Sequence, residues 1–408
     1  MKFNVFLLHI IKKKLSAMSL WISYITGSVI FIFFILIFLM NFFIKPYYYL
    51  KAMNEKIIQI FHSDKLKLQF KQNNNMEKNL LEVYPGKGII EIKRIAKDSS
   101  GYSIDPTREY AAPYRSRYVN VSKEGYRIIK NQKEFSYAKN QRNIFIFGGS
   151  TTWGYRLPDN ETIASYVQSE LDRRSKKFIY NVFNYGICSG YSKDEKRFFE
   201  RLIINNRIPH YAIFIGGLND FCRVALRWPG ETNKNSFLEF KIIKKYLFDP
   251  YFFWRGEFLK LFGISPKMSD CLIKYDEKSI EDAGRELIFN WRAIRGISNE
   301  YDIKCIFVLQ PISVYDYPLE KNLFLSEDDL KKERSYYLAA NKGYRLLLRS
   351  DMLNSFTFLD LHKLQIKGYE YVDSCHYSSD FSKRIAESLT EEILKDNDFY
   401  NIKENDAD

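Results

Sequence analysis

Residues 143–154 read Asn-Ile-Phe-Ile-Phe-Gly-Gly-Ser-Thr-Thr-Trp-Gly, a short apolar run that leads into a glycine-rich turn. An unbroken apolar run of this length is typical of a strand that is covered on both faces of a sheet. Two glycines then permit a tight turn, and Ser150 follows directly. Taken alone, the serine is equally consistent with an ordinary strand-to-helix turn or a phosphate loop, although the lysine of a Walker loop is missing.

Similar apolar runs recur along the chain and alternate with amphipathic stretches. Because alternating strands and helices favour parallel pairing with right-handed crossovers, we predict a three-layer α/β/α sandwich around a five-stranded, doubly wound parallel sheet of flavodoxin-like type. The predicted strands are Asn143–Phe147, Phe178–Asn184, Tyr211–Ile215, Lys304–Leu309 and Phe356–Leu361. The predicted helices are 161–174, 193–206, 279–300, 328–350 and 380–395.

Polar or glycine-rich clusters follow the strands at the edge where such sheets form their sites. The second strand leads into Asn184–Ser192, which contains Gly186 and Gly190, and the third leads into Gly216-Gly217-Leu218-Asn219-Asp220. A glycine amide or the Asn219 amide could face a developing oxyanion, but a loop or a turn cap explains each cluster better when it is taken alone.

Near the C-terminus, Asp373 stands three residues before His376. At this spacing a carboxylate can orient an imidazole that serves as a general base. The only rival pair is Asp360 and His362, at the end of a strand. We rank that pair well below Asp373 and His376, because we expect its two-residue spacing at the end of a strand to point the two side chains to opposite faces and so to separate them.

These blocks, in this order, resemble those of the SGNH (GDSL-like) hydrolase superfamily over roughly residues 115–395. Val119–Arg127 and Val308–Pro311 also resemble segments of membrane-linked members. The resemblance implies a nucleophile at Ser150, a triad completed by Asp373 and His376, and an oxyanion hole made by Ser150, Gly190 and Asn219. Gly190 is preferred to Gly186 because Gly-Tyr-Ser matches the ending of the family's second block.

One residue departs from the family pattern, because Gly149 stands where an acidic residue commonly precedes the nucleophile. This favours polysaccharide-modifying relatives over simple secreted lipases as a template. The expected activity is serine-dependent hydrolysis of an O-acyl ester, with acetyl as the expected acyl group, on a cell-surface glycan or lipid-linked sugar through an acyl-serine intermediate. Two alternatives stay open: an O-acyltransferase served by a multi-span acyl-donor membrane protein, and a non-catalytic glycan-binding or assembly protein.

The N-terminal part of the chain carries a candidate membrane anchor. No charged residue occurs between Lys14 and Lys45, and residues 20–44 are long enough to span a bilayer of about 30 Å. We therefore predict a short cytoplasmic N-terminus (1–19), a single transmembrane signal anchor (20–44) and an extracytoplasmic remainder. That remainder divides into a juxtamembrane stalk with some short strands (45–114), the hydrolase-like domain (115–396, with an insertion at 221–278) and a polar tail (397–408).

Composition narrows the partners further. The formal net charge is +13, but the basic residues are mixed with acidic ones and form no nucleic-acid motif, so nucleic acid is not an expected partner. Five cysteines occur without a Cys-x-x-Cys pair, which gives no support to a metal or redox motif. We expect neither a metal nor another cofactor.

Overall fold

The computed structural model describes residues 28–29, 31–33, 75–104, 110–225, 275–331, 335–365 and 368–405, with side chains in the last helix up to residue 395. The chain divides into two compact units, and the larger comprises Asn73–Glu257 and Ser265–Asp408. Of the smaller unit only residues 28–29 and 31–33 are described, and they are helical. Among the described residues no helix has the length and apolar character needed to cross a membrane. The predicted anchor, 20–44, lies almost wholly outside the described residues.

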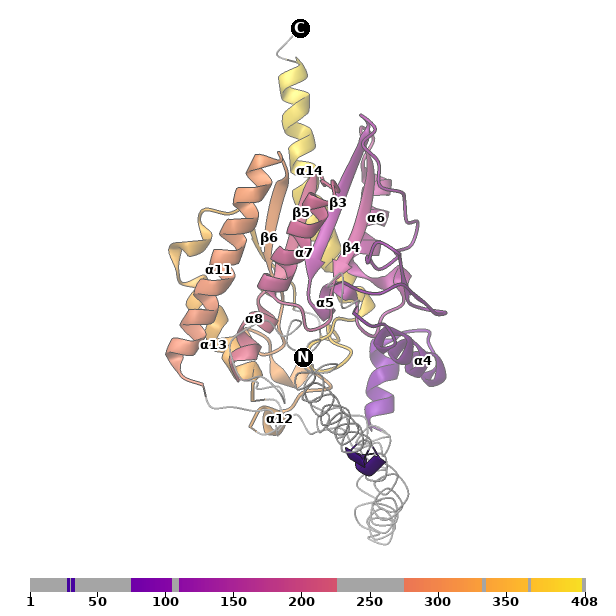
Figure 1. Ribbon diagram of the computed structural model, residues 1–408, viewed down its shortest axis with the longest axis vertical. Helices are drawn as coiled ribbons and strands as arrows, with labels where there is room; N and C mark the ends of the chain where they lie inside the picture. The colour runs from indigo at the N-terminus through magenta and orange to yellow at the C-terminus, as the bar shows by residue number, and fades with distance from the viewer. Residues whose placement is uncertain are drawn as a thin grey trace, which may run out of the picture. The chain divides into compact units, whose positions relative to one another are not determined.

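The larger unit is built on a five-stranded parallel sheet in the order β4-β3-β5-β6-β7 (Figure 1). The strands are β3 (Gln141–Gly148), β4 (Ile179–Gly186), β5 (Tyr211–Gly216), β6 (Lys304–Leu309) and β7 (Phe358–Asp360). The five predicted strands are therefore confirmed, and so is the α/β fold class. β3 lies between β4 and β5, with Gly148 opposite both Gly186 and Ile215. The end of β3 therefore lies at the point where the strand order reverses, as expected for a site in a doubly wound sheet.

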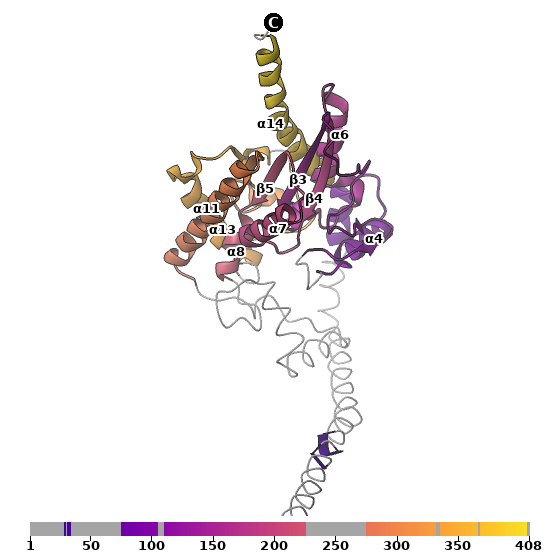
Figure 2. The same cartoon turned by 45° about the horizontal axis from the view of Figure 1, so that its top comes forward.

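Helices cover both faces of the sheet, because the strand side chains alternate between two apolar clusters. Phe145, Phe147 and Phe214 belong to the cluster under one helical layer, while Ile144 and Ile213 belong to the cluster under the other. Figures 1 and 2 show the first layer in front of the sheet and α14 behind it. The first layer contains α7 (Ser192–Ile204), α8 (Leu218–Cys222), α11 (Glu277–Glu300) and α13 (Tyr337–Leu348); the second contains α6 (Ile163–Arg174) and α14 (Ser379–Asn405).

Shorter elements complete the described part of the chain. They are α4 (Ile89–Ser100), β1 (Tyr114–Arg115), β2 (Asn120–Val121), α5 (Ser150–Trp153), η2 (Asp159–Glu161), η3 (Arg223–Ala225), η5 (Leu319–Lys321), α12 (Glu327–Lys331), η6 (Asp351–Leu353) and η7 (His362–Leu364).

The structure differs from several of the secondary-structure predictions. The described part of the predicted stalk is mainly helical, at residues 75–83 and in α4, and its extended structure is limited to a bridge between Ile104 and Ala111 and the first residue of β1, Tyr114. The single helix predicted at 328–350 is two helices, α12 and α13, with a turn at residues 335–336. The predicted polar tail begins within α14, which ends at Asn405. Of the predicted insertion, residues 226–274 lie outside the described residues.

The helical segment 75–100 packs against the domain that follows it. Leu80, Tyr84 and Ile92 form a buried cluster with Leu157 and Val372, and Val83 is a further member. Val372 is the neighbour of Asp373, so the segment predicted to be a stalk covers one side of the predicted site.

Candidate active site

Ser150, His376 and Asp373 form a continuous chain of hydrogen bonds. His376 Nε2 lies 2.8 Å from Ser150 Oγ, and His376 Nδ1 lies 2.8 and 2.9 Å from the two carboxylate oxygens of Asp373. Because a carboxylate only accepts, Nδ1 carries the ring proton, and Nε2 is free to accept the proton of the Ser150 hydroxyl. The structure thus brings together the three residues that the sequence selects.

Local backbone structure explains how each member is placed. Ser150 is the first residue of α5, directly after the end of β3. The carboxylate of Asp373 accepts hydrogen bonds from the backbone N–H groups of Cys375 (3.0 Å) and His376 (2.9 Å) through Oδ1. The short turn therefore folds the acid back against its own histidine, which is why the three-residue spacing works.

The electrostatic environment favours an ionised acid beside a basic ring. Burial alone would raise the pKa of Asp373, but His376 and then Arg156 hold this pKa well below its ordinary value. Burial alone would lower the pKa of His376, but Asp373 raises it well above the ordinary 6.5. The pair can therefore hold a proton taken from Ser150.

Asn219 reaches the serine loop from α8, at the end of β5. Its Nδ2 donates to the carbonyl oxygen of Gly190 at 2.7 Å, which leaves the second amide hydrogen for another acceptor. Gly149 allows this approach, because a Cβ at that position would lie 2.6 Å from Asn219 Nδ2. Asp220 accepts from the backbone N–H groups of Ser192 and Gly217, which fixes the start of α8.

Neither candidate glycine presents its N–H to the site as we predicted. Gly190 N–H donates to the carbonyl oxygen of Ile187 (2.9 Å), and Gly186 N–H donates to Asn184 Oδ1 (3.0 Å). Gly190 contributes its carbonyl instead, as the acceptor that orients Asn219. The Gly190 N–H is not available to a substrate because residues 187–190 form a tight turn that this N–H closes with its own backbone hydrogen bond.

The rival pair is not separated, and our expectation about it is wrong. The chain turns into η7 directly after β7, so that His362 Nδ1 lies 2.5 Å from Asp360 Oδ1. The other ring nitrogen lies 3.3 Å from Asp316 Oδ2. With a carboxylate on each side, His362 has no hydroxyl or thiol partner among its hydrogen bonds in the described residues, so it lacks a nucleophile to activate.

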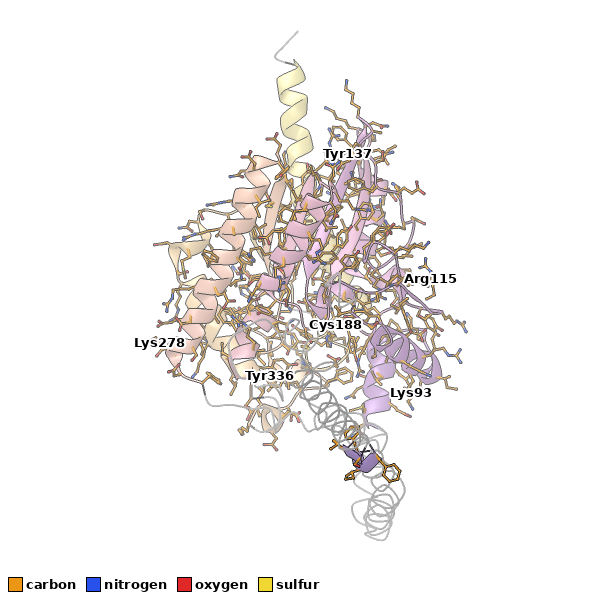
Figure 3. The ribbon with its side chains drawn as sticks, in the orientation of Figure 1. Lys93, Arg115, Tyr137, Cys188, Lys278 and Tyr336 are labelled. Atoms are coloured by element: carbon orange, nitrogen blue, oxygen red, sulfur yellow. The ribbon has the colours of Figure 1, made fainter. Side chains whose placement is uncertain are left out.

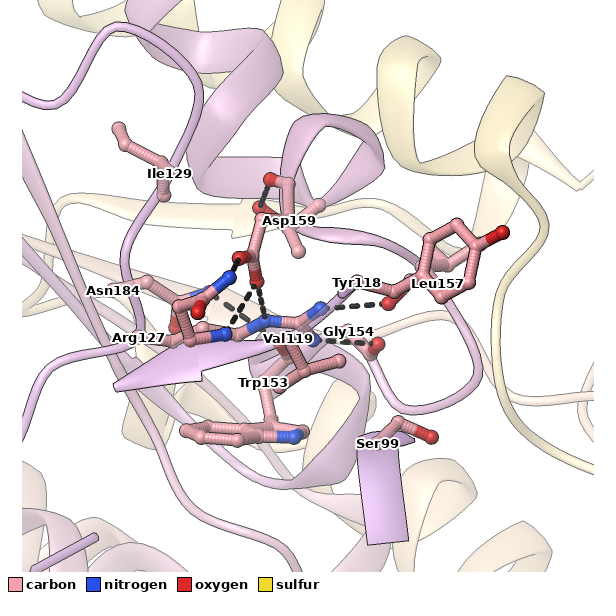
Figure 4. A network of polar contacts seen from close by, with 12 residues as sticks. Ser99, Tyr118, Val119, Arg127, Ile129, Trp153, Gly154, Leu157, Asp159 and Asn184 are labelled. Atoms are coloured by element: carbon pink, nitrogen blue, oxygen red, sulfur yellow. Dashed lines mark hydrogen bonds and ion pairs between the residues drawn. The ribbon is translucent and has the colours of Figure 1, made fainter. Parts of the chain in front are cut away.

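Arg127 holds the turn after Ser150 through hydrogen bonds to its carbonyl oxygens. The sequence analysis assigned no role to this residue. Its side chain is fully buried, pairs with Asp159 at 2.9 Å and donates to three carbonyl oxygens (Figure 4). These carbonyls belong to Trp153, Gly154 and Leu157. Burial lowers the pKa of Arg127, and Asp159 opposes this shift. The only signal in the sequence was the position of Arg127 in the segment Val119–Arg127.

Two further residues beside the triad were also missed. The ring of Tyr155 lies 4.6 Å, centroid to centroid, from that of His376. Arg156 Nε lies 3.2 Å from Asp373 Oδ2, as an ion pair rather than an aligned hydrogen bond. No motif marks either residue.

One group in the described part of the chain has metal-ligating atoms close together, namely Asp373, Cys375 and His376. Cys375 Sγ lies 3.6 Å from His376 Nδ1. Because Asp373 and His376 already hydrogen-bond each other, and His376 also bonds Ser150, we interpret this group as the triad and its neighbour. The four described cysteines are all free thiols.

No family model and no curated protein matches the sequence. Among solved structures, a carbohydrate acetylesterase from Sinorhizobium meliloti is similar at 11% identity and a TM-score of 0.36, over 62% of this chain and 99% of its own. A psychrotrophic esterase from Pseudoalteromonas sp. is similar at 14% identity and a TM-score of 0.35, over 62% and 97%. A lipolytic protein of the G-D-S-L family from Veillonella parvula is similar at 10% identity and a TM-score of 0.36, over 62% and 98%.

The geometry of this chain stands independently of those superpositions. A serine at the end of the central strand, an asparagine after the next strand, and an Asp-x-x-His turn before the last helix converge at one edge of a parallel sheet. In its fold and in the placement of these residues, the chain has the α/β/α architecture and the serine–histidine–aspartate arrangement that its resemblance to the SGNH hydrolases implies.

Proposed function

We propose that this protein is a serine-dependent O-acyl ester hydrolase that works through an acyl-serine intermediate. The observation that carries the proposal is the 2.8 Å contact between His376 Nε2 and Ser150 Oγ, with Asp373 behind the ring. A hydroxyl that donates to a carboxylate-supported imidazole is the activated nucleophile of acyl transfer.

The reaction divides into two halves. Ser150 Oγ attacks the ester carbonyl while His376 Nε2 takes its proton, and the leaving alcohol receives that proton when the carbon–oxygen bond breaks. Water then gives a proton to His376 and attacks the acyl-serine, which releases the acid and restores Ser150. The Asn219 amide supplies one oxyanion donor, with the Ser150 N–H at the start of α5 as the second.

Acetyl is the acyl group that we propose, and a cell-surface glycan or lipid-linked sugar is the proposed carrier. These finer assignments rest on the sequence resemblance to polysaccharide-modifying members and on the uncharged run 20–44. That run would tether the domain to a membrane by a single span and place it outside the cytoplasm. Protease treatment of the full-length chain in sealed, inside-out membrane vesicles tests this placement. A domain outside the cytoplasm is then protected inside the vesicle, and digestion of the domain contradicts the placement.

The activity is tested with the purified full-length chain and an acetyl ester, alongside labelling by a fluorophosphonate probe. Wild-type protein should hydrolyse the ester and label at Ser150, and Ser150→Ala should lose both. Ser169→Ala is the matched control, because its hydroxyl lies on α6 and donates only to the Ser165 carbonyl oxygen. Equal hydrolysis by the wild type and Ser150→Ala rejects the proposal.

The same assay addresses the transferase alternative. With an acetylated donor and an unacetylated oligosaccharide present together, a hydrolase releases acetate, whereas a transferase yields acetylated oligosaccharide. Retention of biological function in a Ser150→Ala strain would instead favour the non-catalytic alternative.

A further inference from the structure

Two consecutive residues after α5 contact the other two members of the triad. Tyr155 lies against the His376 ring, and Arg156 forms an ion pair with Asp373. Neither belongs to the triad or to the oxyanion donors. Their contacts nevertheless place an aromatic ring beside the base and a cation beside the acid.

The backbone of Arg156 adopts a conformation that needs support. Its φ is +66°, in the left-handed region that non-glycine residues rarely occupy. Its N–H donates to Ser99 Oγ (3.0 Å), and its carbonyl oxygen accepts from the Tyr84 hydroxyl (2.7 Å). Such a conformation persists where surrounding contacts hold it, and here both contacts come from the helical segment 75–100.

Tyr155 is anchored to the same segment. Its hydroxyl lies 3.0 Å from Ser100 Oγ, at the last residue of α4. Ser99 and Ser100 therefore hold Arg156 and Tyr155, respectively. The end of α4 fixes the two residues that contact the histidine and the aspartate.

The ion pair acts on charge more than on orientation. Asp373 Oδ1 is already held by two backbone N–H groups, so the carboxylate keeps its place without Arg156. Arg156 approaches the other oxygen, Oδ2, which also faces His376 Nδ1. The guanidinium and the imidazole therefore share one carboxylate oxygen.

We propose that Arg156 is a positioning residue that acts through Asp373, and that α4 is part of the active site because it holds Arg156 in place. The proposal rests on the proposed function, since it concerns the base of that reaction. By sharing the carboxylate, Arg156 weakens the hold of Asp373 on a protonated His376 and so keeps more of the ring in its neutral, proton-accepting form.

The direction of the effect follows from the groups around the pair. His376 faces Asp373, Cys375, Cys188 and the Tyr155 ring, and Asp373 faces Arg156 and Tyr84. Arg156 is the only cation in this set. Removing its charge should therefore raise the pKa of His376 and move the acidic limb of activity to higher pH.

The test compares Arg156→Gln, Arg156→Lys and wild type in the full-length chain, with kcat/KM measured across pH. For Arg156→Gln we expect the acidic limb to move up by about one pH unit, with a much smaller loss on the alkaline plateau. Arg156→Lys keeps the charge and should restore most of the wild-type profile. A uniform loss at every pH, an unchanged profile or a downward shift each overturns the proposal.

A second readout separates this proposal from the first. The ring of His376 can be titrated by NMR without substrate, so the measurement does not depend on catalysis. The pKa of His376 should be higher in Arg156→Gln than in the wild type. Absent esterase activity in the wild type overturns the proposed function, whereas an unchanged NMR titration overturns the role of Arg156. The two failures are therefore distinguishable.

The role of α4 needs its own variant. Ser99→Ala removes the acceptor of the Arg156 N–H and should shift the acidic limb of activity in the same direction by a smaller amount. This variant also tests the proposal if Arg156→Gln does not fold. The control is Lys93→Gln, because Lys93 lies on α4 in an exposed ion pair with Glu77 (Figure 3). Equal pH profiles for Ser99→Ala and Lys93→Gln would overturn the part assigned to α4.

Discussion

The buried guanidinium of Arg127 and the carboxylate of Asp159 face each other with Nε 2.9 Å from Oδ1, beneath the turn that follows Ser150. Asp159 also accepts from the Asn120 side chain at 2.8 Å, so its carboxylate is fully engaged. The pair joins the segment before β3 to the segment after α5. It therefore holds the serine loop from a direction that no motif reveals.

Asp159→Asn should destabilise the fold strongly, because it leaves the Arg127 charge buried without its counter-ion. We expect a loss of about 3–5 kcal/mol in the free energy of unfolding, measured by urea denaturation. Asp282→Asn is the control, since its pair with Arg285 is exposed and should contribute well under about 1 kcal/mol. Similar losses in the two variants would contradict the importance of the buried pair.

Gly149→Ala should impair catalysis without unfolding the protein. The backbone of Gly149 is extended, with φ −79° and ψ −155°, so alanine causes no backbone strain, but its Cβ would displace the Asn219 amide. We expect kcat to fall by about a hundredfold, as for loss of one oxyanion donor. Gly296→Ala on α11 is the control, because nothing lies within 4 Å of its added methyl group. That variant should keep full activity and gain up to about 1 kcal/mol in stability.

Asn219→Ala removes the same donor directly. Since the amide acts on charge that develops only in the transition state, kcat should fall by about a hundredfold while KM changes little. Asn205→Ala, at the exposed end of α7, is the matched control. A change confined to KM would show that Asn219 binds the ground-state substrate instead.

Activity should fall on the acidic side at a pH above that of an ordinary histidine. His376 must be neutral to accept the Ser150 proton, and Asp373 raises the pKa of His376 above 6.5, so protonation removes the base as the pH drops through that raised value. The measurement is kcat/KM between about pH 5 and pH 9, corrected for spontaneous ester hydrolysis. An acidic limb below 6.5 contradicts the assignment of His376 as the base.

The sheet was predictable because its signal is local. Each strand is a short apolar run, such as Ile144–Phe147, and burial on both faces makes such runs stand out. The triad was predictable for a similar reason, because Asp373 and His376 lie within one turn and Ser150 follows the central strand. Their convergence is then a consequence of parallel topology.

Other parts of the site depend on contacts between distant segments. Arg156 lies in no motif, and its role arises from a left-handed backbone held by Tyr84, which is 72 positions away in sequence. Gly190 was assigned the right loop but the wrong group, because only the closed turn at 187–190 shows that its N–H is occupied. The Asp360–His362 pair was misjudged because residues two apart along a strand share a face, and η7 begins at His362 just after β7, which keeps the two side chains in contact.

The contacts of the segment 75–100 also determine where the chain can be shortened. A fragment that starts near residue 115, where the family resemblance begins, would keep every triad atom and still lack Tyr84, Ser99 and Ser100. Such a fragment could fold and yet hydrolyse esters poorly, and its weak turnover would be mistaken for a wrong substrate. Shortened versions of the chain should therefore begin before residue 75.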